Sequence, residues 1–344
     1  MKKGTKIALL IALIMIAVGA TICNIARGRG ESLGALVANG GLTVSSGAHG
    51  LGDQQGYTVC LSGEERFAAA EVRALDLDWL SGSVRMEPYD GKEILLREES
   101  TRELTEGQRM RWKLSNGRLS VVFCANGEHS LPEKALTVLL PRDYAAGEIV
   151  TDATSASVSL SALRANGKIA VKTTSGDILL ESCAAREAKI DSSSGEVRVE
   201  ASAMSGKIDI DTTSGAVTLL ACACAELDVD TTSGAVRAET TAVSGEINVE
   251  TASGSVVLTG LPEGCRADVD TTSGNVTLRY DEKPGEIEVE TTSGDVTLSV
   301  PQGTELDMDF DSDSGDFSGE LHFTPNGVKV RVETASGDLK IEGN

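Results

Sequence analysis

The sequence predicts an all-β protein whose chain winds as a parallel β-helix, a solenoid of rungs about 20 residues long. A Ser-Gly pair recurs nine times between residues 175 and 337, at steps of 19 to 22 residues. Valine, isoleucine and leucine alternate with polar residues on both sides of each pair, which indicates a strand, a corner and a second strand. Aromatic residues make up only 3% of the chain, which suits a thin aliphatic core. Because crossovers between parallel strands are almost always right-handed, we expect right-handed winding.

The N-terminal residues predict a membrane anchor. Residues 7–26 form an almost unbroken apolar run, preceded by Lys2, Lys3 and Lys6. About 20 such residues span a bilayer as a helix, so we expect residues 1–26 to hold a single transmembrane helix. The flanking charges favour an extracytoplasmic position for the repeats. The alternative is a secretory signal cleaved near Ala20, which would also export the chain.

Three further segments follow this anchor. Residues 27–56 are rich in glycine and serine and are expected to form a flexible linker. Residues 57–148 lack the regular repeat and predict irregular rungs or a capping sheet, because an open solenoid end exposes an unpaired strand edge. Residues 149–344 carry the regular repeats, and the first copy has Ala156 in place of the corner glycine.

The glycine of each Ser-Gly pair is expected at a corner that requires positive φ, a conformation that glycine adopts at little cost. The serine before it, and the threonine or serine three residues before it, are expected to satisfy backbone groups at the corner. Positions five before and two after the glycine are apolar in all nine repeats, which predicts that they face the core. The nine structural corner residues are Gly176, Gly195, Gly215, Gly234, Gly254, Gly274, Gly294, Gly315 and Gly337.

The seven cysteines include one plausible disulfide pair in an exported chain, Cys60 with Cys124. Cys183 and Cys222 hold the same repeat position two rungs apart, about 9.6 Å, which is too far for a disulfide. Most of the cysteines are therefore expected to be free and buried. Neither the cysteines nor the three histidines have the spacing of a metal site.

Four residues before the corner glycine, every repeat carries an acid except the first of the nine, which has Lys172. Carboxylates stacked about 4.8 Å apart repel one another. One hypothesis is a solvated face that keeps the protein soluble and prevents edge pairing. The other is a surface for Ca²⁺ or for cationic peptides, which the net charge of −21 would attract. This acidic ladder consists of Asp191, Asp211, Asp230, Glu250, Asp270, Glu290, Asp311 and Glu333.

The repeat text Thr-Thr-Ser-Gly-Asp-Val, the apolar columns and the N-terminal anchor resemble the putative-adhesin family of β-solenoid domains, a domain of unknown function in bacterial cell-envelope proteins. The stretch LDLDWLSGSVRMEPYDGKEILL, residues 75–96, is similar to the opening rung of that family. The stretch LTVLLPRDYAAGEIVTDATSASVSL, residues 136–160, is similar to its join to the first full repeat. The resemblance covers roughly Val72 to Ile341 and implies an envelope location without an assigned reaction.

We therefore expect a non-catalytic structural or interaction module displayed from the cell membrane, with envelope proteins, surface polymers or cationic peptides as partners. The alternative is envelope-stress sensing, or sequestration of cationic antimicrobial peptides or cations, by the acidic ladder. A third possibility, a polysaccharide-active enzyme, is disfavoured because the acids are periodic and no single rung carries a distinct catalytic pair. Nucleic acid is not expected as a partner, because phosphate contacts need a basic patch.

Overall fold

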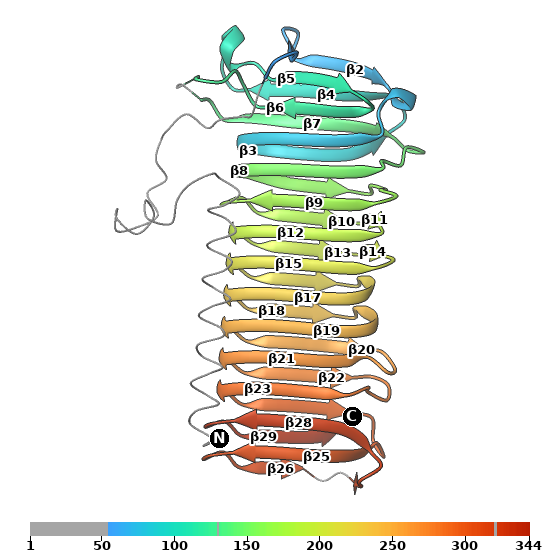
Figure 1. The fold of residues 1–344 in the computed structure, drawn as a ribbon, viewed down its shortest axis with the longest axis vertical. Coiled ribbons are helices and arrows are strands. Elements are labelled where there is room, and N and C mark those ends of the chain that lie inside the picture. Colours follow the sequence, from blue (N-terminus) through green and yellow to red (C-terminus); the bar gives the residue numbers. More distant parts are fainter. Residues whose placement is uncertain (1–53, 129–130, 320–321) are drawn as a thin grey trace, which may run out of the picture. The chain divides into compact units, whose positions relative to one another are not determined.

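The computed structural model describes residues 54–128, 131–319 and 322–344, which form a parallel β-solenoid with a β-sheet cap at one end (Figure 1). The predicted all-β solenoid is confirmed; its right-handed sense stays a prediction. The helical content of the described residues consists of two short 3₁₀ helices, η1 (Ala69–Glu71) and η2 (Glu106–Gln108). The predicted transmembrane segment and nearly all of the predicted linker lie outside these residues. Across the described ranges, no helix is long and apolar enough to cross a membrane.

Each rung contributes one strand before its Ser-Gly corner. Strands of neighbouring rungs pair in parallel and in register, so that Val249 lies beside Val229 on one side and Val269 on the other. We call this the pre-corner sheet. In spatial order from the cap, after β3 (Ala74–Tyr89) and β8 (Glu148–Ser161), its strands are β9 (Lys168–Thr173), β12 (Glu187–Ser194), β15 (Lys207–Ser214), β17 (Ala223–Ser233), β19 (Ala242–Ser253), β21 (Arg266–Ser273), β23 (Ile287–Ser293), β28 (Val328–Thr334) and β25 (Glu305–Ser312).

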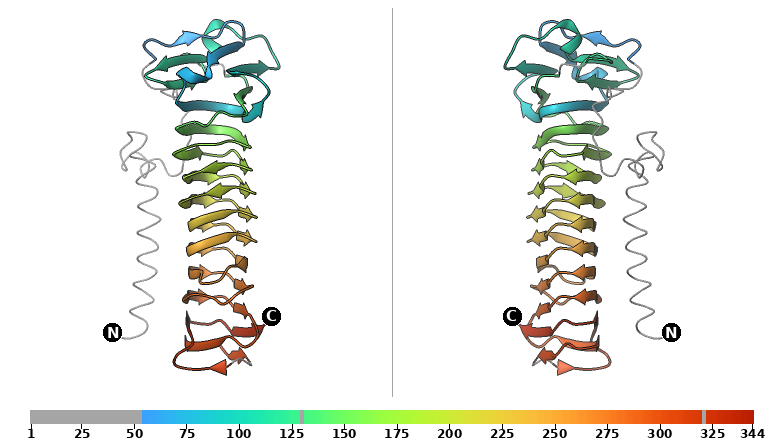
Figure 2. Two further views of the ribbon diagram at one scale, coloured as in Figure 1. Left: turned by 90° about the vertical axis from the view of Figure 1, so that its right-hand side faces the viewer. Right: turned by 90° about the vertical axis from the view of Figure 1, so that its left-hand side faces the viewer.

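The strand after each corner joins a second, post-corner sheet, and Figure 2 shows both sheets from the sides of the stack. β3 and β8 pass through the corner and contribute to both sheets. Short third-side strands, β11 (Ala184–Ala185) and β14 (Ala203–Met204), stack on the start of β17. The post-corner strands are β10 (Ile178–Glu181), β13 (Val197–Glu200), β16 (Val217–Leu220), β18 (Val236–Glu239), β20 (Val256–Leu261), β22 (Val276–Tyr280), β24 (Val296–Val300), β29 (Leu339–Gly343) and β26 (Phe317–Gly319).

The core lies between the two sheets and consists of the apolar columns that the sequence predicts. Val249 and Val269 from one sheet and Val256 and Leu258 from the other are all 0% exposed. Burying one such side chain stabilises the fold by about 1.5–3 kcal/mol, and the same contribution recurs in every rung. The solenoid is therefore held together by a repeated small core rather than by one large one.

The corner glycines are required for a reason other than the one expected. Among the nine, only Gly195 (φ 127°) and Gly215 (φ 156°) have positive φ, so the prediction of a positive-φ corner is wrong for most of them. A Cβ atom at Gly274 would lie 2.0 Å from the carbonyl oxygen of Gly254 in the preceding rung, and a Cβ at Gly254 would lie equally close to Gly234. At the nine glycine positions the backbones of adjacent corners thus approach too closely for a side chain.

The buried hydroxyls at the corner are only partly satisfied. Thr173 Oγ1 accepts a hydrogen bond from the backbone N–H of Gly176 (3.0 Å), and Ser312 Oγ accepts one from Gly315 (2.7 Å), as predicted. The prediction is wrong for the equivalent hydroxyls of the other rungs, whose buried oxygens have no hydrogen-bond partner within the described residues. They belong to Ser192, Thr212, Thr231, Thr251, Thr271, Thr291 and Thr334.

Positive φ occurs instead at a second bend, six residues after the corner. Six rungs have this bend, and only one of them has a glycine there, Gly260; the other five have alanine, serine or threonine, so the sequence gives little glycine signal. These residues adopt the left-handed region with φ between 46° and 55°. They are Ala162, Ser182, Ala201, Ala221 and Thr240.

Replacing Ala201 (φ 46°) with glycine is expected to stabilise the protein by up to about 1 kcal/mol. In the left-handed region the Cβ of alanine lies too close to the following carbonyl oxygen, and glycine removes that contact. Part of this gain is lost because glycine makes the unfolded chain more flexible and so raises the entropic cost of folding. Urea unfolding measures the change. The matched control is Ala203→Gly in the extended strand β14, which should destabilise; equal effects of the two substitutions would refute the strain argument.

The cap combines parallel and antiparallel strands. β3 is a complete rung, with Gly82 paired to Ala156. β6 and β7 pair with β3 in parallel, and β7 then pairs with β4 antiparallel. The cap strands are β1 (Thr58–Val59), β2 (Glu64–Ala68), β4 (Glu93–Ser100), β5 (Arg111–Ser115), β6 (Arg118–Val122) and β7 (Lys134–Pro141).

The predicted disulfide between Cys60 and Cys124 is wrong, since both thiols are free and buried. Cys60 follows β1, and Cys124 follows β6, while β5 pairs with both strands and lies between them. Two strand spacings amount to about 9.6 Å, beyond the reach of a disulfide. Cys183 and Cys222 are free, as predicted.

The last two rungs stack in an order that reverses their order in the chain. β23 pairs with β28 rather than with β25, and β25 then pairs with the far side of β28 (Figure 1). Chain order and stacking order therefore differ at this end. The inward side chains of the rung of Gly337 are valine, leucine and isoleucine, which fit between aliphatic rungs. The rung of Gly315 instead has Phe310 and Phe317 in its inward columns, and these bulkier side chains are accommodated at the open end of the stack.

Candidate functional site

The acidic ladder forms one continuous column on the outer face of the pre-corner sheet. The register pairs Asp211 with Asp230, Asp230 with Glu250, and Glu250 with Asp270. The structure extends the ladder to Asp78 and Asp152 in the first two rungs, which the sequence pattern missed. In spatial order the column is Asp78, Asp152, Lys172, Asp191, Asp211, Asp230, Glu250, Asp270, Glu290, Glu333 and Asp311.

A second acid column, missed by the sequence analysis, lies beside the first. It occupies the position two residues earlier in each strand, and residues two apart in a strand project from the same face. The signal was present in the sequence at six residues before the corner glycine. In spatial order this column contains Asp76, Val150, Ala170, Lys189, Asp209, Asp228, Asn248, Asp268, Glu288, Arg331 and Asp309.

Two lysines compensate the acids in the rungs near the cap. Lys189 Nζ lies 2.6 Å from Asp209 Oδ2 and 2.9 Å from Asp211 Oδ2. Lys207 Nζ lies 2.6 Å from Asp228 Oδ2 and 3.4 Å from Asp209 Oδ1. These pairs lower the pKa of Asp209 against the opposing effect of its partial burial. In this part of the face, lysines of the chain itself therefore balance the neighbouring acids.

The central rungs carry acids without such compensation. Within the described residues, none of the central acids Asp230, Glu250, Asp268, Asp270 and Glu290 forms an ion pair, and Arg331 at the far end pairs with Glu288 and Glu333 instead. Partial burial, and then repulsion from neighbouring acids, raises the pKa of all five of these carboxyls. We call these five residues the central acid patch.

The central acid patch predicts a stability that falls as pH rises. Burial and repulsion raise the pKa of both Asp230 and Asp270 to about 7, whereas an unfolded aspartate titrates near 4. Between about pH 4 and 7 the folded state therefore holds more protons than the unfolded state, and stability is lost as pH rises through this window. Asp209, with a lowered pKa, titrates below it.

Asp270→Asn is accordingly expected to stabilise the protein at pH 8 and to leave it nearly unchanged at pH 4. The gain should stay below about 1 kcal/mol, because the carboxyl is partly exposed and screened by salt. Urea unfolding between pH 4 and 8 at fixed ionic strength measures it, with Glu263→Gln in an exposed loop as control. A variant as pH-sensitive as the parent would show that the patch does not control this dependence.

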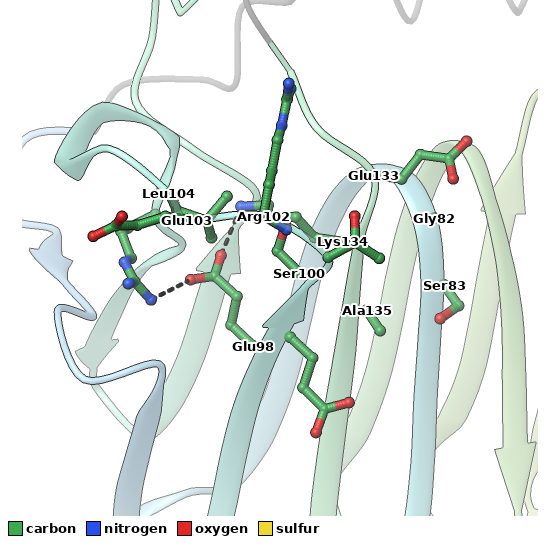
Figure 3. Close-up of a pocket in the computed structure, with 13 residues that line it drawn as sticks. Gly82, Ser83, Glu98, Ser100, Arg102, Glu103, Leu104, Glu133, Lys134 and Ala135 are labelled. Atoms are coloured by element: carbon green, nitrogen blue, oxygen red, sulfur yellow. Dashed lines mark hydrogen bonds and ion pairs between the residues drawn. The ribbon is translucent and has the colours of Figure 1, made fainter.

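The cap contains a buried ion pair that the sequence analysis also missed. Lys134 and Glu98 have fully buried side chains, with Lys134 Nζ 2.6 Å from Glu98 Oε1 (Figure 3). The ammonium also donates to the backbone carbonyls of Gln108 (2.6 Å) and Phe123. It lies 3.9 Å from the ring centroid of Phe123 and 5.0 Å from that of Trp79. Burial lowers the pKa of Lys134, against the opposing effect of Glu98.

A groove of about 760 Å³ opens beside this pair, lined by residues of both charges (Figure 3). The three protons of Lys134 are all used by its three acceptors, so this side chain cannot serve as a base. Arg109 lies 3.7 Å from Glu98 Oε2, which accepts no hydrogen bond within the described residues. The cluster ties β4, β7 and the connections after η2 and β6 together beneath the groove.

Calcium, predicted as a possible ligand, has no recognisable site in the described ranges, where no three or more His, Cys, Asp or Glu side chains are arranged to hold a metal ion. The acids of the two columns are spread along the sheet rather than gathered around a point. Diffuse association with cations remains compatible with this arrangement.

The comparison with protein families decides the classification. A family model described as Toastrack DUF4097 matches residues 72–264 and 263–342. The chain belongs to the Toastrack family. The predicted resemblance to adhesin-like β-solenoid domains of unknown function is thereby confirmed. No curated protein matches the chain.

The Toastrack match begins at Val72, just before β3, and ends within β29. It thus includes all the rungs and the cap strands β4 to β7, while β1 and β2 precede it. Among solved structures, a protein described as "a putative cell adhesion protein from Clostridium sporogenes" is 9% identical and covers 82% of this chain and 99% of its own, with a TM-score of 0.22.

Proposed function

We propose that this Toastrack chain is a non-catalytic interaction module of the cell envelope that binds cationic partners along its pre-corner sheet. The observation that carries the proposal is the central acid patch, whose carboxylates repel one another and form no ion pair within the described residues. A protein that needed only a soluble surface could alternate its charges, as the rungs near the cap do with Lys189 and Lys207. A basic partner would relieve this repulsion on binding.

The form of the patch indicates the form of the partner. Successive acids lie about 4.8 Å apart along the stack, and the two columns are separated by roughly 7 Å. Such a surface suits a partner with several cationic groups, because many weak contacts add up when they are made by one molecule. Basic peptides and cationic surface polymers have this chemistry. Sensing or sequestering cationic antimicrobial peptides is the envelope role that fits it, and diffuse Ca²⁺ binding is the simpler competitor.

The proposed location follows from residues 7–26. A single membrane-spanning segment there, with the rungs on the extracytoplasmic side, would display the acidic sheet where envelope partners occur. Cleavage near Ala20 would release the same surface. Protease protection of the rungs in sealed cells distinguishes the orientations, since an extracytoplasmic domain is digested without lysis.

The enzyme hypothesis has little support in the geometry. Acids occur in every central rung, whereas catalysis by carboxylates needs two groups in distinct environments at one position. The groove in the cap is lined in part by Lys134, whose ammonium group donates its hydrogen bonds to Glu98 and to the carbonyls of Gln108 and Phe123. Turnover of an acidic polysaccharide by the purified chain would reverse this conclusion.

Binding of a lysine-rich amphipathic peptide to the full chain in detergent micelles tests the proposal. We expect the double variant Asp230→Asn with Asp270→Asn to bind at least fivefold more weakly than the parent. The control, Glu103→Gln with Glu263→Gln, removes the same charge from exposed loops and should bind as the parent does. An equal loss in both variants would reduce the effect to net charge, and no binding by the parent would refute the proposal. Millimolar Ca²⁺ that stabilises the parent without the peptide would favour the cation alternative.

A further inference from the structure

The end of the solenoid opposite the cap carries a cluster of aromatic side chains. Three of the five phenylalanines of the chain, Phe310, Phe317 and Phe323, cluster in the terminal rung formed by β25 and β26, followed by β27 (His322–Phe323). The ring centroids of Phe310 and Phe317 are 6.1 Å apart, and those of Phe317 and Phe323 are 5.8 Å apart. Phe317 is 41% exposed and Phe323 46% exposed. Phe310 and Phe317 occupy inward columns, and no rung of the described residues lies beyond them.

The same rung has an open strand edge. One side of β25 pairs with β28 along its length, from Leu306 to Ser312. On its other side, β27 pairs only with Glu305 and Leu306. Among the described residues, Asp307–Ser312 thus has no strand on its outer edge, a length typical of a whole strand. β27 shows that this edge accepts a parallel strand.

The aromatic side chains at the two ends of the solenoid differ in their exposure to solvent. At the cap end, Trp79 and Phe123 pack edge to face with centroids 4.9 Å apart and are both 0% exposed, covered by the Lys134 cluster. At the other end the corresponding aromatic group is uncovered. Charge on an edge strand prevents unwanted pairing, which explains acids on β25 but not exposed phenylalanines.

The side chains of β25 define what would fit this edge. Leu306, Met308 and Phe310 face the core side, while Asp307 and Asp309 alternate with them on the outer side. A second copy related by a two-fold axis would place these acids against acids, which is destabilising. A strand with apolar residues on one face and basic residues on the other would cover the phenylalanines and oppose the aspartates.

We propose that the free edge of β25 is a docking site for an extended segment of a partner protein in which apolar and basic residues alternate, bound by strand addition. Main-chain hydrogen bonds to Asp307–Ser312 would supply affinity, and the apolar face of the segment would close the core over Phe310 and Phe317. This site is separate from the central acid patch: it recognises an alternating strand, whereas the patch recognises cationic charge.

The test uses the full chain in detergent micelles and an eight-residue peptide that alternates lysine with valine. A peptide of the same composition with its lysines in one block serves as the comparison. We expect the alternating peptide to bind at least tenfold more tightly and to slow hydrogen exchange at the amides of residues 307–312 at least tenfold. Asp307→Lys with Asp309→Lys should weaken its binding at least tenfold and create binding of an alternating glutamate-valine peptide. Phe317→Ser should also weaken binding.

The matched control reverses two charges away from the edge, Asp230→Lys with Asp270→Lys. It should bind the alternating peptide with an affinity within threefold of the parent's. If both charge-reversed variants lose the peptide equally, binding is spread over the acidic sheet, and the edge proposal fails while the proposed function stands. Binding of the alternating peptide that is unaffected by the changes at Asp230 and Asp270 supports the edge proposal, even if the central acid patch itself binds no peptide. Exchange protection of residues 307–312 in a peptide-free dimer would make a second copy the occupant and overturn the proposal.

Discussion

Lys134→Met is expected to cost about 3–5 kcal/mol of folding free energy. The substitution leaves the carboxylate of Glu98 in a fully buried position without its main partner. It also removes the donor to the carbonyls of Gln108 and Phe123. Arg109 Nη1 lies 3.7 Å from Glu98 Oε2, too far to replace the ammonium as the partner of the carboxylate. Of the two tryptophans of the chain, Trp112 lies in cap strand β5 and Trp79 in β3, where it packs against Phe123 of the cap, so urea unfolding followed by tryptophan fluorescence reports on this region.

Two further variants separate the buried pair from the loss of any lysine. Lys340→Met removes a surface cation whose ammonium is 2.7 Å from Glu342, and it should cost less than about 1 kcal/mol. The double variant Lys134→Met with Glu98→Gln removes the uncompensated charge and should recover a large part of the loss. A loss below 1 kcal/mol for Lys134→Met alone would show that the cap does not depend on the pair.

The sequence predicted the solenoid because every rung repeats the same inward positions. The columns five before and two after the corner glycine are apolar in all nine repeats, and period-two alternation leaves one face buried. The register of the acidic ladder followed from the same spacing. The second acid column was equally periodic, but its lysine, asparagine and arginine interruptions concealed it.

Features outside the repeat could not be predicted in this way. Glu98 and Lys134 are 36 residues apart in a segment without periodicity, and only the folded cap brings them together. The reversed order of the last rungs has the same cause, because a 20-residue period fits both orders. Phe310 and Phe317 in otherwise aliphatic columns were the available signal, since their bulk favours an end position.

The corner glycine gives the second large prediction, because its role differs from the one that sequence reasoning assigns. Gly274→Ala is expected to cost about 3 kcal/mol or more, since the new Cβ would lie 2.0 Å from the carbonyl oxygen of Gly254. Backbone atoms of a stacked rung cannot move aside without disturbing the register of both sheets. Far-UV circular dichroism during urea unfolding measures the loss across the rungs.

Gly264→Ala distinguishes close approach from backbone conformation. Gly264 has φ of 74°, but a Cβ there meets no atom within 4 Å, so its replacement should cost only about 1–2 kcal/mol for the left-handed conformation. If backbone conformation alone set the cost of replacing a glycine, Gly264→Ala would be the costlier variant and Gly274→Ala, at a position without positive φ, would be nearly neutral. The opposite order would establish that corner glycines are needed because each rung lies against the backbone of the next. The near-constant Ser-Gly spacing is then a consequence of stacking itself.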